Sequence, residues 1–91
     1  MNREQLMEHL KTKCNVNFVS TTEEFNGSVG GVWLSGEDSA DMYDGALMFK
    51  YYASLTEPYE LGVHNIMYEW LDQLGWYAEW NDAGTIMLWE I

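Results

Sequence analysis

The sequence predicts an α+β domain with two layers, in which two helices pack on one face of an antiparallel sheet. Apolar residues recur at helical spacing in two segments and alternate with a period of two in several others, and turn signals separate neighbouring strands. The predicted order is helix, three strands, helix and two strands. Because runs of strands and separate helices favour a layered antiparallel arrangement, both helices are expected on the same face. The 91 residues are expected to form a single domain, 1–91.

The first helix is predicted over residues 3–13. Asn2 followed by Gln5 is typical of a capping box, in which each side chain accepts a hydrogen bond from the other residue's backbone N–H. Leu6 and Leu10 then recur at the spacing that places side chains on one face of a helix. We expect this face to be buried against the sheet.

Three strands are expected next, at residues 16–21, 29–35 and 46–53. The Asn26-Gly27 pair between the first two strands is typical of a hairpin turn. The third strand has the clearest alternation in the chain. One of its faces carries Leu47, Phe49 and Tyr51.

A second helix is predicted over residues 63–74, with Gly75 as the residue that ends it. Residues 76–80 and 85–91 alternate like strands. The four residues between them, 81–84, are typical of a hairpin loop. The C-terminal part of the chain is therefore predicted to be a helix followed by a β-hairpin.

The side chains of this C-terminal part are expected to form much of the core. The second helix carries a broad apolar stripe, which comprises Val63, Ile66, Met67, Trp70, Leu71 and Leu74. We expect Trp70 and Leu74 to pack against the strand predicted at residues 46–53. Alternate tryptophans of the hairpin are expected to fill the remaining space, namely Trp76, Trp80 and Trp89.

Charge is the property that most restricts function. The chain has 4 Lys and Arg residues against 15 Asp and Glu residues, a net charge of −11. Residues 14–91 hold one lysine and thirteen carboxylates, a net charge of −12. Such a field repels nucleic acid and attracts basic surfaces over a Debye length of about 8–10 Å. We therefore exclude direct binding of DNA or RNA and expect a basic nucleic-acid-binding protein as the partner.

Residues 36–45 are predicted to be a loop rich in carboxylates. The loop contains Glu37, Asp38, Asp41 and Asp44. Carboxylates at this density are compatible with a hard cation, a solvated loop, or a recognition strip that imitates phosphates and pairs with Arg and Lys. Because the loop lacks the alternating ligands and the final Glu of an EF-hand, we predict no metal site.

A second set of carboxylates lies on the second helix and the hairpin. It comprises Glu69, Asp72, Glu79 and Asp82. Trp and Tyr residues surround this set, and both residue types are enriched where proteins bind one another and accept Arg by stacking. The sequence therefore predicts a second partner-binding surface here.

Nothing in the sequence indicates catalysis, so we predict no enzyme and no cofactor. His64 has no nucleophile or carboxylate at a diagnostic spacing and is expected to have a structural or helix-entry role. Cys14 closes an apolar stripe and is expected to be a small buried hydrophobe. Gly30-Gly31 lacks the Lys and helix start of a phosphate-binding loop. The single cysteine and the lack of an apolar signal segment favour the cytoplasm.

In size, charge and aromatic content the whole chain resembles the small acidic inhibitors that phages use against bacterial defences, namely anti-CRISPR and anti-restriction proteins. The resemblance implies a DNA mimic that occupies the basic channel of a nuclease or CRISPR effector in the host cytoplasm. An immunity protein or antitoxin that neutralises a basic nuclease toxin has the same electrostatics and is the alternative. A third class is an accessory domain whose charge provides solubility alone.

Overall fold

The computed structural model describes residues 1–91 except 17, 37–39, 42–47 and 55, and describes the backbone alone at 13, 15, 40 and 41. The helices in this part of the chain are α1 (Arg3–Lys13), α2 (Thr22–Asn26) and α3 (Asn65–Gln73). The strands of the main sheet are β2 (Val19–Thr21), β3 (Val32–Ser35), β7 (Trp76–Asp82) and β8 (Thr85–Glu90). Two short pairs lie outside it, β1 (Asn15–Val16) with β4 (Ala40–Asp41) and β5 (Tyr59–Glu60) with β6 (Val63–His64).

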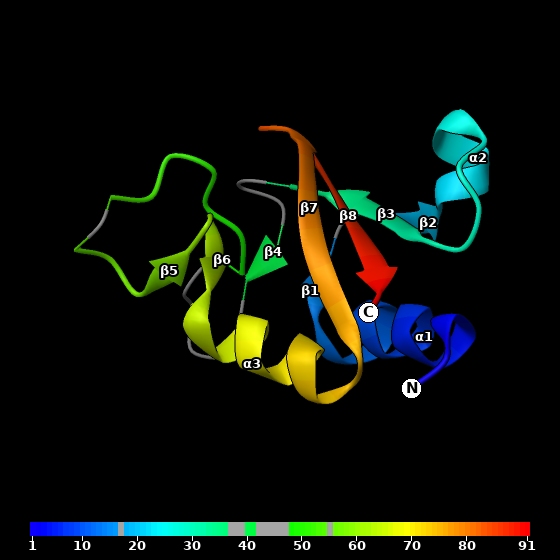
Figure 1. Cartoon of the computed structure of the whole chain (residues 1–91), viewed down its shortest axis with the longest axis horizontal. Coiled ribbons are helices and arrows are strands. Elements are labelled where there is room, and N and C mark those ends of the chain that lie inside the picture. The colour runs from blue at the N-terminus through cyan, green and yellow to red at the C-terminus, as the bar shows by residue number, and fades with distance from the viewer. Residues whose placement is uncertain (17, 37–39, 42–47, 55) are drawn as a thin grey trace.

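A four-stranded antiparallel sheet of order β2-β3-β8-β7 forms the centre of the fold (Figure 1). Side chains of α1 and α3 share one hydrophobic core with alternate residues of β3 and β8, so both helices lie on the same face of the sheet. The predicted α+β class is therefore confirmed. No helix in the described ranges is long and apolar enough to cross a membrane.

The capping box and the first helix form as predicted. The Asn2 side chain accepts a hydrogen bond from the Gln5 backbone N–H at 2.8 Å, and the Gln5 side chain accepts one from the Asn2 backbone N–H at 3.0 Å. These bonds satisfy two of the N–H groups that a helix leaves unpaired at its start. Leu6 and Leu10 of α1 are fully buried.

The prediction of a hairpin turn at Asn26-Gly27 is wrong. These residues end the short helix α2, and Gly27 has the left-handed backbone conformation, φ +83°, that commonly ends helices. At its other end, the Thr21 side chain accepts a hydrogen bond from the Glu24 N–H and caps the helix. Asn-Gly suits a left-handed position in either setting, so the dipeptide could not distinguish a hairpin turn from a helix end.

The strand predicted at residues 16–21 is divided in two. β1 pairs with β4, whereas β2 pairs with β3, so the two halves belong to different sheets. The strand predicted at 29–35 is shorter than expected and begins at residue 32. It starts late because Gly30 has a positive φ of +94°, which interrupts the extended backbone before β3.

The strand predicted at residues 46–53 does not form in the part of it that is described. Residues 48–53 contain a single bridge, between Phe49 and Val63, and the chain then turns, with the Ala53 N–H donating to the Lys50 carbonyl. Phe49 is buried as expected, but the Tyr51 side chain is exposed. Residues 46 and 47, and with them the expected contact of Leu47, lie outside the described residues.

The C-terminal helix and hairpin are close to the prediction. Helix α3 is followed by Gly75, whose φ of +84° allows the chain to reverse into β7. β7 continues to Asp82, with a register shift between Trp80 and Asp82, so the connection is two residues rather than the expected four. The hairpin is therefore longer and its turn tighter than the alternation indicated.

The core lies between the sheet and the two long helices. It contains Leu6, Leu10, Val32, Leu34, Met48, Phe49, Val63, Met67, Leu71, Trp76, Ile86 and Leu88. Trp70 and Leu74 pack against it while partly buried, and the Trp70 ring lies 4.8 Å from the His9 ring of α1. Trp76 is 1% exposed, and its indole N–H donates to the Met1 carbonyl at 2.8 Å.

The other two hairpin tryptophans lie in different environments. Trp80 is half-buried at the margin of the core, as expected. Trp89 instead lies on the opposite face of the sheet and covers Gly31, where an added Cβ would come within 2.6 Å of its ring. The expectation that Trp89 fills the core is therefore wrong. Successive side chains of β8 point to opposite faces of the sheet, so Trp89 points away from the core that its neighbour Leu88 enters.

The different burial of Trp76 and Trp70 predicts which of them contributes more to the free energy of unfolding. Trp76→Ala is expected to lower the free energy of unfolding by about 3–5 kcal/mol, because it empties a closed site in the core. Trp70→Ala is expected to cost less, since Trp70 is partly exposed beside His9. Urea denaturation followed by circular dichroism measures both variants. A larger loss for Trp70→Ala would contradict this assignment of the core.

Candidate protein-binding surfaces

Three of the four carboxylates of the predicted acidic loop lie outside the described residues, namely Glu37, Asp38 and Asp44. Asp41 belongs to β4, where its backbone is opposite Asn15 of β1, and its side chain is outside the described part. The partner-binding role of these four residues stays a prediction.

The carboxylates of α3 and β7 form an exposed set around one edge of the sheet. Glu69, Asp72 and Glu79 are all exposed. Asp72 lies beside β7, because it lines a small hollow together with Tyr77 and Ala78 of that strand. We call this the α3–β7 surface, and it comprises Tyr68, Glu69, Asp72, Tyr77, Ala78 and Glu79.

Asp82 is exposed like these residues, but its carboxylate is already hydrogen-bonded within the hairpin. It accepts bonds from the Thr85 hydroxyl at 2.7 Å, the Gly84 N–H at 2.9 Å and the Asn81 side-chain amide at 3.1 Å. These donors, the Thr85 hydroxyl first, lower the pKa of Asp82. Asp82 therefore holds the turn between β7 and β8 in place. Its predicted contact with a partner is untested.

Two of the four basic side chains are paired away from the α3–β7 surface. Arg3 forms an ion pair with Glu23 at 2.6 Å, and Lys50 forms one with Glu57. In both pairs the cation's hydrogen bond is the largest cause that lowers the pKa of the glutamate. Among the described residues, no ion pair involves the carboxylates of the α3–β7 surface. That surface therefore presents its negative charge unneutralised by this chain's described cations.

The face of the sheet opposite α1 and α3 carries an aromatic cluster that the sequence patterns did not predict. The Trp33 ring lies 4.6 Å from Phe18 and 4.4 Å from Phe25. Its indole N–H is buried and has no hydrogen-bond partner in the described structure. Register places Trp33, Met87 and Glu79 in one row on this face. The signal was present, because the unbroken apolar runs in β3 and β8 indicate strands with side chains packed on both faces.

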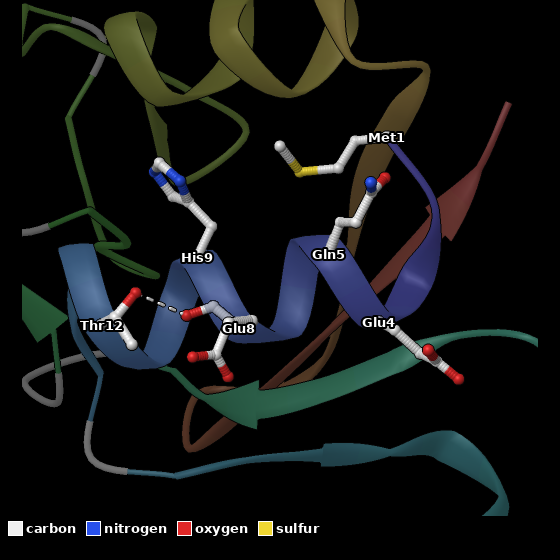
Figure 2. A pocket seen from close by; sticks show the side chains of 6 residues that line it. All are labelled: Met1, Glu4, Gln5, Glu8, His9 and Thr12. Carbon is white, nitrogen blue, oxygen red and sulfur yellow. Dashed lines mark hydrogen bonds between the residues drawn. The ribbon is translucent and has the colours of Figure 1, made fainter.

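A broad, open hollow of about 450 Å³ lies along α1 (Figure 2). It is lined by Met1, Glu4, Gln5, Glu8, His9 and Thr12. Figure 2 shows Gln5 and His9 directed from α1 toward α3, the Met1 side chain running between the two helices, and Glu4 and Glu8 directed away from α3. The Thr12 hydroxyl donates to the Glu8 backbone carbonyl at 2.8 Å, and the His9 ring packs on Trp70. Among the described residues of this hollow, no hydroxyl is therefore hydrogen-bonded to the His9 imidazole.

The remaining candidate residues have structural roles. His64 is buried, and its Nδ1 accepts a hydrogen bond from the Ile66 N–H at 3.2 Å, which caps α3 and confirms the predicted helix-entry role. Cys14 is half-buried at the end of α1, and this burial raises the pKa of its thiol. In the described ranges no group of three or more His, Cys, Asp or Glu residues is placed to hold a metal ion.

Comparison of the chain with protein-family models, curated proteins and solved structures finds no match.

The hydrogen bonds to Asp82 predict how the stability of the hairpin varies with pH. Because folding lowers the pKa of this carboxyl, its stabilisation is present above the ordinary aspartate pKa of about 3.9 and is lost as the pH falls through the folded value. Asp82→Ala should therefore unfold at a lower temperature than the parent near neutral pH, and the difference should shrink in acid. Thermal unfolding over an acidic pH series measures this.

Asp72→Ala provides the control, because the Asp72 carboxylate accepts no hydrogen bond in the described part of the chain. It should melt close to the parent at each pH. A difference between Asp82→Ala and the parent that stays constant into acid would show that the carboxylate is not what holds the turn.

Proposed function

We propose that this protein is an acidic inhibitor that binds the nucleic-acid-binding surface of a bacterial defence nuclease or CRISPR effector and acts as a DNA mimic. The proposal places its action in the cytoplasm of the host cell. The observation that supports it is the α3–β7 surface, where Glu69, Asp72 and Glu79 are exposed and none forms an ion pair with a described cation.

The chemistry of this surface suits the basic channels of such enzymes. A carboxylate accepts charge-assisted hydrogen bonds from Arg and Lys as a phosphate does. Unneutralised charge also steers a basic partner toward the surface and raises the association rate, and added salt screens this effect. The inhibitor offers no phosphodiester bond, so an enzyme that binds it has nothing to cleave.

The framework behind the carboxylates supports tight binding. Asp72 lies on a helix whose Met67 and Leu71 are buried in the core, and Glu79 lies on a strand paired along its length with β8. Side chains on packed elements lose less conformational entropy on binding than side chains on a free loop, so less of the interaction energy is spent on ordering.

The proposal predicts salt-sensitive and competitive binding. The complex with a basic nuclease or CRISPR effector should weaken steeply as ionic strength rises, because screening acts on separated surface charges. The cognate nucleic acid should also displace the protein. Fluorescence anisotropy at a series of salt concentrations measures both effects. A complex that is indifferent to salt and to excess DNA would instead indicate an apolar interface. Binding confined to a secreted nuclease toxin would favour the immunity-protein alternative.

Charge-neutralising variants locate the interface. The surface variant combines Glu69→Gln, Asp72→Asn and Glu79→Gln. The matched control removes the same charge elsewhere with Glu4→Gln, Glu8→Gln and Glu24→Gln. A carboxylate that pairs with a desolvated Arg is worth about 2–5 kcal/mol in a complex, so the surface variant should lose at least about tenfold in affinity and the control much less. Equal losses would show that only total charge matters.

The predicted acidic loop is tested in the same assay. The loop variant combines Glu37→Gln, Asp38→Asn, Asp41→Asn and Asp44→Asn. We expect it to lower affinity while the fold is kept or slightly stabilised, because self-repulsion falls with net charge. If it inhibits as well as the parent, the loop is solvated surface and the α3–β7 surface carries the binding.

A further inference from the structure

β7 is an edge strand whose outer side is open at Ala78. It is the last strand in the order β2-β3-β8-β7, at the margin of the sheet in Figure 1. The Ile91 N–H donates to the Gly75 carbonyl at 2.9 Å, and these residues are opposite each other in the register. Hydrogen-bonded and non-bonded pairs alternate in an antiparallel ladder, so Tyr77 and Glu79 bond to β8 and the N–H and C=O of Ala78 point away from it. No backbone hydrogen bond within the described ranges reaches that side of Ala78.

The strand lacks several of the features that protect an edge, although it carries the charged residues Glu79 and Asp82. Proteins block open edges with short strands, prolines, lysines or bulges. β7 is seven residues long and contains neither Pro nor Lys, and its register shift lies only at the Trp80/Asp82 end. The other edge strand, β2, is three residues long and leads directly into α2. α3 lies against the first residues of β7, and the Trp80 indole N–H donates to the Leu61 carbonyl at 2.8 Å near the other end. The open part of this edge in the described sheet is therefore the outer side of Ala78.

The two sides of this edge differ in chemistry. On the helix side, Ala78 lines a small hollow of about 20 Å³ whose other walls are Tyr68, Leu71, Asp72, Trp76 and Tyr77, so it is mainly apolar and aromatic. On the opposite side, Tyr77 is 45% exposed and Glu79 is exposed beside it. A strand added to β7 would alternate its side chains between these two environments. Apolar, β-branched residues suit the first, whereas Arg suits the second, because it can stack on the Tyr77 ring and pair with Glu79.

We propose that β7 accepts an extended segment of the partner as a fifth strand, and that this segment alternates basic with apolar β-branched residues. The inference rests on the proposed function in taking the partner to be basic, and it adds a backbone contact that charge alone does not supply. Charge also decides against a second copy of this chain as the occupant. Edge-to-edge pairing of two copies would bring two chains of net charge −11 together across exposed Glu79 side chains.

Three peptides of identical side chains and charge test the backbone contact. The parent probe is Ac-Arg-Val-Arg-Val-Arg-Val-NH2, and two further probes carry N-methyl groups on all valines or on all arginines. Only alternate N–H groups of an added strand face β7, so one methylated probe should bind at least about tenfold more weakly than the parent probe while the other stays closer to it. Amide hydrogen exchange should show new protection at Ala78 with the parent probe.

Equal affinity of the three probes would overturn the inference while leaving salt-dependent attraction to basic partners, and hence the proposed function, intact. Lack of binding by all three, or unchanged exchange at Ala78 in the bound state, would also overturn it. The nuclease and CRISPR-effector assays test the proposed function separately. Glu79→Gln should weaken the parent probe several-fold, whereas the matched change Glu24→Gln on α2 should not. Equal effects of the two substitutions would contradict the placement at β7.

Discussion

The pairing of β3 with β8 is the contact on which the rest of the fold depends. It joins residues 32–35 to residues 85–88, and so links the N-terminal and C-terminal parts of the chain across the intervening sequence. Closing so long a loop costs entropy before any contact compensates for it. Burial of Leu34 and Ile86, which are opposite each other in the register, offsets that cost. Once β8 is held by β3, β7 becomes the edge of the sheet, and α3 and its carboxylates take their place beside it.

Local signals in the sequence were enough for the elements whose geometry is decided by neighbouring residues. The capping box at Asn2 and Gln5 and the reversal at Gly75 each depend on a few adjacent side chains or on one backbone conformation. Alternation was less informative, because it indicates an extended chain without saying what pairs with it. Phe49 meets Val63 through a single bridge, and Trp89 packs on Gly31 rather than in the core.

The α3–β7 surface was also predictable only in part, because the sequence does not show which segments pair with one another. Composition indicates that Glu79 and Asp72 are exposed, since charged side chains are seldom buried without partners. It does not indicate that Asp82 is bound within its own turn, because that depends on the two-residue connection and the position of Thr85. Nor can it reveal that β7 is an edge, which follows from the order of strands that lie far apart in the sequence.

The contact between Trp89 and Gly31 has an evolutionary consequence. The indole ring covers a position where even a methyl group would collide, and the Thr22 methyl group closes the same space at 2.8 Å. A lineage that gains a side chain at residue 31 must first replace Trp89 with a smaller residue. Substitutions at the two positions are therefore expected to occur together. The aromatic cluster around Trp33 lies on that same face of the sheet. Gly31 therefore helps to set the packing on this face although it contributes no side chain.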